Sequence, residues 1–255
     1  MNLIRNYNPA FDIMKCIAAI MITNSHYQPL YEGHNTACAT LGVHGNALFF
    51  LVSGYLLFSS LQKNEFNVPF GKWYQQKVKR LWLPIIVLGI LIGFWHPDIT
   101  WIRFMPSLWF VKCFLVSFPI IFFIIKMKRM SFLWGAFVAS IVLMILIVFC
   151  HSRQPLSIFH FFHYYCYFPV ILLGVIIAKY QDVVLKNNNG VISFICTIIS
   201  FGLYFVVMKF GKGQINSSLY YTQLLGYIPL FLFLFYMFKC TNTEWIKTFS
   251  LTKYF

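Results

Sequence analysis

Three ionisable side chains interrupt an otherwise apolar stretch close to the N-terminus. Residues 9–30 contain Asp12, Lys15 and His26 among mostly apolar residues. Ionisable groups are costly to place in an apolar membrane helix, and they therefore mark candidate functional positions. An imidazole titrates near neutral pH, so His26 is suited to take a proton from a reacting hydroxyl as a general base.

The spacing of these residues places them on one face of a helix. Lys15 and His26 are separated by about 20° beyond three full turns, and Asp12 lies about 40° from His26 around the same helix. Along the axis, Lys15 and His26 are about 16 Å apart. Two simpler interpretations remain open. Asp12 and Lys15 form an i,i+3 ion pair at the membrane interface, and His26 is an interfacial histidine that binds only water.

A basic segment with interleaved aromatic residues precedes a later apolar run. It contains Lys72, Trp73, Tyr74, Lys77, Lys79, Arg80 and Trp82. This composition predicts either a site for a ligand that carries phosphates or an interfacial helix that holds anionic lipid headgroups. Lys79 and Arg80 adjoin the apolar run and are the stronger candidates for phosphate binding.

Other polar or small residues allow a weaker interpretation. The Ser53-Gly54 pair indicates close packing between helices, or a place where a ligand chain passes the backbone; we favour packing. His160 and His163 have i,i+3 spacing, but no third metal ligand accompanies them, so no metal site is predicted. Cys38 and Cys150 are the two cysteines near the predicted outer face, where a disulfide bridge is conceivable.

The composition is that of a membrane protein with several spans. Of the 255 residues, 60% are hydrophobic and 10% are charged, and the mean hydropathy is +0.72. Soluble domains have about 45–50% apolar residues. Disordered chains, disulfide scaffolds and soluble enzyme domains are therefore excluded, and an all-α bundle of about eight transmembrane helices is predicted. The predicted spans are 9–30, 41–61, 81–95, 107–125, 132–150, 157–178, 191–210 and 219–238, and the third is short unless it starts before residue 81.

The charge pattern predicts the orientation of this bundle. The net charge is +14, which in a soluble protein would indicate a nucleic-acid partner. Here most Lys and Arg residues between the predicted spans fall on the side that holds both chain ends. The positive-inside rule therefore places both termini in the cytoplasm. It also explains the positive net charge without a nucleic-acid partner.

Four sequence segments resemble one known family. Ten residues separate Lys15 from His26, residues 46–57 read NALFFLVSGYLL, residues 77–84 read KVKRLWLP, and residues 107–111 read SLWFV. In this order they resemble the acyltransferase 3 family of bacterial integral-membrane acyltransferases, in which many members carry Arg at the position of Lys15. The resemblance is clear over residues 11–111 and only compositional afterwards.

The resemblance implies a reaction and a set of site residues. The family transfers acyl groups, most often acetyl, from coenzyme A to hydroxyls of glycans or other envelope molecules. By this resemblance His26 is the base or the acyl carrier, and Lys15 with Asp12 lies on the donor side. The residues implied to bind acetyl-CoA, or another acyl-CoA used as co-substrate, are Lys72, Lys77, Lys79, Arg80 and Ser53. No tightly bound cofactor is expected.

The resemblance also implies a location and an extent. Residues 1–255 are expected to form one membrane-embedded acyltransferase domain in the bacterial inner membrane, with fewer spans at its C-terminal end than is usual for the family. The expected partners are acyl-CoA, a glycan or lipid-linked sugar acceptor, and membrane lipids. There are two alternatives. One is a transporter or flippase for an envelope precursor, although the sequence lacks the inverted repeat that many transporters contain. The other is an inactive, truncated acyltransferase.

Overall fold

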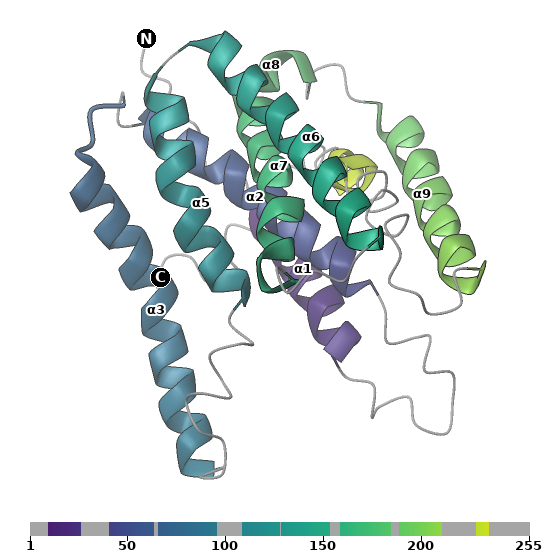
Figure 1. The fold of residues 1–255 in the computed structure, drawn as a ribbon, viewed down its shortest axis with the longest axis horizontal. Coiled ribbons are helices and arrows are strands. Elements are labelled where there is room, and N and C mark those ends of the chain that lie inside the picture. The colour runs from purple at the N-terminus through teal and green to yellow at the C-terminus, as the bar shows by residue number, and fades with distance from the viewer. Residues whose placement is uncertain are drawn as a thin grey trace, which may run out of the picture. The chain divides into compact units, whose positions relative to one another are not determined.

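The described part of the chain is helical. The computed structural model describes residues 10–26, 41–63, 66–95, 109–127, 129–153, 159–184, 189–210 and 228–234, which contain no strand (Figure 1). Its helices are α1 (Ala10–His26), α2 (Gly42–Lys63), α3 (Phe70–Trp95), α5 (Trp109–Lys126), α6 (Met130–Arg153), α7 (Phe159–Lys179), α8 (Gln181–Val184) and α9 (Gly190–Phe210). Residues 228–234 form a further helical segment. The predicted all-α class is confirmed for these residues.

The predicted spans coincide with these helices. The first seven each correspond to one helix, and the described part of 219–238 is helical too. Two of the described helices, α2 and α5, are long and apolar enough to cross a membrane. The number of spans and the cytoplasmic location of both termini stay predictions.

Helix α3 begins well before the predicted third span. It starts at Phe70 rather than at residue 81, so the basic segment and the apolar run form one helix. Residues 70–80 read FGKWYQQKVKR. Gln, Lys and Arg have high helix propensity, but they lower the hydropathy on which a span prediction rests. The basic residues therefore belong to a rigid element and not to a connecting loop.

Several helices expose large apolar side chains along one face. The exposed residues include Val116, Ile120 and Phe123 of α5, Val138, Val142 and Leu146 of α6, and Ile195, Ile198 and Ile199 of α9. Exposed apolar surface of this extent is unusual in a soluble monomer. Hydrocarbon as the surrounding solvent accounts for it, since lipid-facing helix surfaces are apolar.

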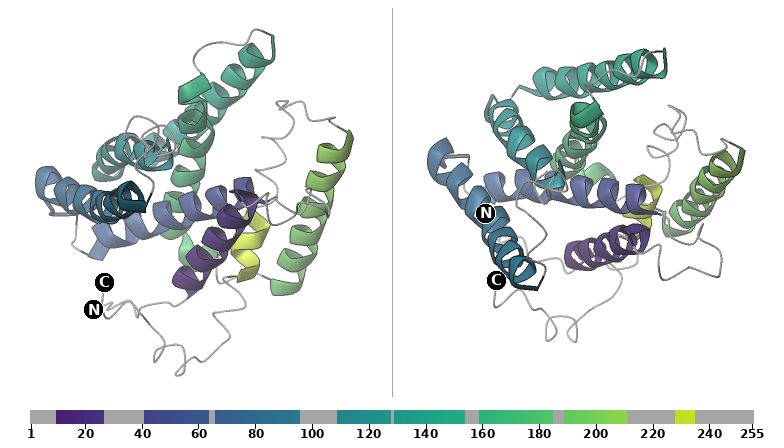
Figure 2. Two further views of the ribbon diagram at one scale, coloured as in Figure 1. Left: turned by 90° about the horizontal axis from the view of Figure 1, so that it is seen from below. Right: turned by 60° about the horizontal axis from the view of Figure 1, so that its bottom comes forward.

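The chain divides into two compact units. One comprises Met1–Ser53 with Ile177–Phe255, and the other comprises Gly54–Ile176. In the first unit, α1 lies beside the start of α2 (Figure 2). Phe11 of α1 packs on Phe231, with ring centroids 6.5 Å apart. The second unit contains the remainder of α2 with α3, α5, α6 and most of α7.

The second unit is held together by aromatic packing between α3 and α5. The indole of Trp73 lies 4.8 Å from the Phe122 ring and 6.1 Å from the Phe118 ring. Phe70 contacts Phe122 as well, with centroids 5.2 Å apart. Trp73, Phe118 and Phe122 are buried. This cluster fixes the first turns of α3 against α5, which in turn packs on α6.

Gly54 allows α2 and α7 to approach within the second unit. A Cβ atom at this position would overlap the carbonyl oxygen of Ile171 and lie 2.9 Å from its carbonyl carbon. Only glycine leaves room for that backbone contact. The helix-packing interpretation of the Ser53-Gly54 pair is therefore confirmed for Gly54.

This contact predicts a large stability effect of a single methyl group. Gly54→Ala should lower the free energy of unfolding by about 1–3 kcal/mol, because the Ile171 carbonyl belongs to a helix backbone that cannot rotate away. Gly135→Ala in α6 is the matched control, since a Cβ there meets nothing within 4 Å. Thermal unfolding in detergent measures both. Equal midpoints for the two variants would contradict the close approach of α2 and α7.

Candidate functional site

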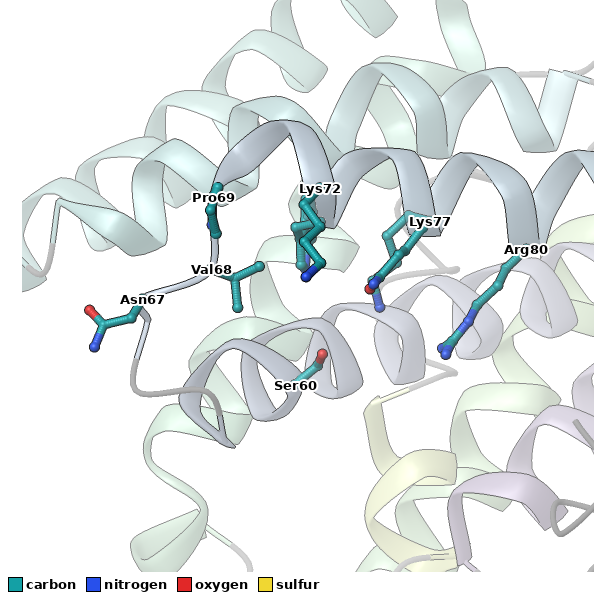
Figure 3. A pocket seen from close by; sticks show the side chains of 9 residues that line it. Ser60, Asn67, Val68, Pro69, Lys72, Lys77 and Arg80 are labelled. Atoms are coloured by element: carbon teal, nitrogen blue, oxygen red, sulfur yellow. The ribbon is translucent and has the colours of Figure 1, made fainter.

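A pocket rich in positive charge lies between α3 and the end of α2, entirely within the second unit. Its volume is about 550 Å³, and it is lined by Ser60, Asn67, Val68, Pro69, Lys72, Trp73, Gln76, Lys77 and Arg80. Figure 3 shows Lys72, Lys77 and Arg80 extending from α3 toward the helix that carries Ser60. The lining residues include three cations and no carboxylate, so the pocket favours an anionic ligand.

The helical repeat explains which basic residues reach this pocket. At 100° per residue, the lining residues of α3 cover an arc of about 140° that runs from Lys72 to Lys77 and includes Arg80. Lys79 falls about 20° outside this arc, next to Lys72, and its side chain is exposed. The structure therefore brings together three of the four predicted basic residues, and Lys79 is absent from the lining.

Trp73 forms one wall of the pocket. It is 3% exposed, and Lys77 Nζ lies 5.9 Å from the centre of its ring, within range of a cation–π contact. Its indole Nε1–H is buried and meets no acceptor among the residues that the structure describes. A buried donor normally has a partner.

The polar residues of α1 lie in the first unit. Lys15 Nζ is 3.5 Å from Asp12 Oδ1, and each side chain is about one third exposed, at 36% and 35%. The i,i+3 ion pair is therefore confirmed. Asp12 Oδ2 is buried and meets no donor within the described residues. Asp12 thus has one oxygen committed to Lys15 and one acceptor left to offer.

His26 is the last residue of α1, and its side chain is exposed. α1 is unbroken from Ala10, so the axial separation of about 16 Å between Lys15 and His26 holds. The end of α1 rests on α2, where a Cβ at Gly45 would lie 2.7 Å from the Ala18 carbonyl oxygen and 2.9 Å from Met21 Cβ. This packing fixes the helix that presents His26.

Comparison with known protein families decides the class of this protein. A family model described as an acyltransferase domain matches residues 8–255. The chain belongs to the acyltransferase 3 family. No curated protein sequence and no solved structure gives a significant match. The family match reaches far beyond residues 11–111, where the sequence motifs are clear. With the apolar helices, it indicates that this acyltransferase is a membrane protein.

Other predicted features of the acyltransferase lie outside the pocket or outside the described residues. Ser53 is half-buried in α2 and is not part of the pocket lining. The side chains of His160 and His163 lie outside the described set, as do Cys38 and the side chain of Cys150. Among the described residues, no group of three His, Cys, Asp or Glu side chains could hold a metal ion.

Sequence reasoning missed the uncharged residues of the pocket. Ser60, Asn67 and Gln76 supply hydroxyl and amide groups beside the three cations. Gln76 could have been found, because Lys72, Gln76 and Arg80 follow i,i+4 spacing on one helix. Ser60 and Asn67 depend on the packing of α2 and on residues 66–69, which no helical repeat predicts.

Proposed function

We propose that this acyltransferase moves an acyl group from coenzyme A to a hydroxyl of a cell-envelope glycan or a related lipid-linked acceptor. The acyl group that we propose is acetyl. The observation that carries the proposal is the basic pocket of α2 and α3, in a chain that belongs to an acyltransferase family. The products are an O-acyl ester and free coenzyme A. No tightly bound cofactor is needed for this transfer.

The pocket supplies what the donor would require. Coenzyme A carries a pyrophosphate and a 3′-phosphate, and Arg80 presents a planar fork of donors that suits phosphate oxygens. Lys72 and Lys77 add flexible point charges on the same arc of α3. The pocket volume of about 550 Å³ offers space for phosphate groups beside these three cations. A lipid headgroup offers the same phosphate chemistry and is the competing occupant.

His26 is the proposed catalytic residue. Its imidazole takes the proton of the acceptor hydroxyl as the oxygen attacks the thioester carbonyl. The new C–O bond forms, the C–S bond breaks, and the imidazolium returns the proton to the leaving thiolate. A covalent acyl-histidine, formed first and then attacked by the hydroxyl, is the alternative sequence for the same residue. Lys15, paired with Asp12, is the proposed donor-side charge on the same helix as His26.

The proposed location follows from the charge bias and the family. We place the protein in the bacterial inner membrane with several spans and both termini in the cytoplasm. The donor is cytoplasmic, and the acceptor hydroxyl is reached from the outer end of α1. The acyl group then crosses most of the membrane while the nucleotide portion of the donor stays on the cytoplasmic side.

Release of free thiol from acetyl-CoA distinguishes this enzyme from a transporter. Membranes that contain the protein and an envelope acceptor should release coenzyme A at a rate proportional to the amount of protein, because each transfer frees one thiol. Membranes from the same cells without the protein supply the background. A rate that equals this background would reject the transferase and favour the transporter or inactive alternatives.

A further inference from the structure

Helix α5 contains a proline that leaves one backbone carbonyl without its usual partner. Pro119 lies inside the helix and has no N–H group. The residue four positions earlier is Leu115, whose carbonyl would otherwise accept a hydrogen bond from residue 119. In an apolar setting, such a carbonyl must find a donor on a neighbouring helix, because water is scarce there.

A tyrosine on α3 supplies that donor. The hydroxyl of Tyr74 donates to the Leu115 carbonyl oxygen over 3.1 Å, across 41 positions of the chain. The Tyr74 ring also stacks on Phe70, with centroids 5.4 Å apart and planes inclined by 16°. Its hydroxyl is thereby held against the same carbonyl that Pro119 leaves open.

This hydrogen bond lies within the turn of α3 that carries the pocket. Tyr74 follows Trp73 directly and stands between Lys72 and Lys77 in the chain. The aromatic contacts of Trp73 with Phe118 and Phe122 hold α3 against α5. A hydrogen bond to a fixed carbonyl is directional. It sets the rotation of α3 and so the direction of its basic side chains.

We propose that Tyr74 is a positioning residue for the donor: its bond to the Leu115 carbonyl, opened by Pro119, orients Lys72, Lys77 and Arg80 over the pocket. The proposal rests on the proposed function, since it assigns the pocket to acyl-CoA. It adds a determinant of donor affinity that makes no contact with the ligand. Tyr74 acts through α3 and is absent from the pocket lining.

The split between KM and kcat tests this role. Tyr74→Phe should raise the KM for acetyl-CoA by about three- to tenfold, with the energy of one neutral hydrogen bond as the upper limit, and leave kcat unchanged at saturating donor. Gln75→Ala, an exposed neighbour outside the pocket lining, is the control and should leave both constants unchanged. A lower kcat with unchanged KM in Tyr74→Phe would mean a loss of folded protein only, and it would overturn the proposal.

Pro119→Ala supplies the second arm of the test. This substitution restores a backbone N–H at position 119, which competes with the hydroxyl of Tyr74 for the Leu115 carbonyl and so weakens the hold of that hydroxyl on α3. In that background, Tyr74→Phe should change the KM for acetyl-CoA by less than about twofold. An equal KM effect of Tyr74→Phe in both backgrounds would overturn the link to Pro119.

A variant of the pocket separates this proposal from the function on which it rests. Arg80→Gln should raise the KM for acetyl-CoA whether or not Tyr74 has a positioning role. If Arg80→Gln weakens donor binding and Tyr74→Phe does not, only the positioning role fails. If neither variant changes the KM for acetyl-CoA, the assignment of the pocket to the donor fails first.

Discussion

His26→Ala should lower the rate of O-acyl transfer by about 10²–10⁴-fold, the usual contribution of a general acid–base group. Donor binding should survive, because His26 lies at the far end of α1 from Lys15, about 16 Å along the axis. The measurements are O-acetylation of envelope glycans in cells and acetyl-CoA binding in detergent. His26 is exposed in the described structure, so its removal should leave the packing of α1 intact.

Variants of Lys15 provide the matched comparison on the same helix. Lys15→Met removes the charge that pairs with Asp12 at 3.5 Å and should raise the KM for the donor rather than remove proton transfer. Lys15→Arg keeps the charge and should be tolerated. Full O-acetylation by an abundant, correctly inserted His26→Ala variant would contradict the catalytic assignment of His26.

The double variant Lys77→Gln with Arg80→Gln should raise the apparent Kd for acetyl-CoA by roughly 10–100-fold. Charge-assisted hydrogen bonds to phosphate are stronger than neutral ones. The expected change in Kd is set below their full strength because Arg80 is exposed and Lys77 is half-buried, and exposed ion pairs contribute less. Direct binding of acetyl-CoA to purified protein in detergent measures it. The effect should shrink as salt is raised, since exposed charges are screened.

Two single-charge variants test whether this result is specific to the pocket. Lys63→Gln removes one positive charge from the exposed end of α2, outside the pocket lining, and should leave the Kd unchanged. Lys79→Gln tests the sequence prediction separately and should have a smaller effect than Arg80→Gln, because Lys79 lies outside the lining arc. If the double variant binds acetyl-CoA with unchanged affinity, the basic residues of α3 do not bind the donor, and binding of anionic lipid headgroups becomes the favoured interpretation.

The sequence predicted the helical elements well because hydropathy and helix period carry that information. Each predicted apolar run coincides with a helix where the structure describes it. The start of α3 at Phe70 differed from the predicted span, since a basic stretch with strong helix propensity looks like a loop on a hydropathy scale. If residues 70–95 had been predicted as one helix, the helical repeat would have placed Arg80 within the arc that lines the pocket and Lys79 outside it.

The site was predictable to the extent that it lies on one element. The Asp12–Lys15 pair and the basic arc of α3 follow from helical spacing alone. The wall formed by Trp73 depends on Phe118 and Phe122 of α5, and the bond from Tyr74 depends on the carbonyl that Pro119 leaves open. These are contacts between helices distant in sequence, which the pattern within each helix cannot specify.

Transfer of labelled acetyl into the envelope tests the central claim most directly. Membranes with the protein, given acetyl-CoA labelled in the acetyl group, should accumulate label in the glycan or lipid-linked sugar fraction. Mild alkali should release this label as acetate, because an O-acyl ester is base-labile. Label that depends on the protein and on His26 is the predicted result. Absence of alkali-labile label from that fraction, with the wild-type protein abundant and correctly inserted, would contradict O-acyl transfer to an envelope hydroxyl.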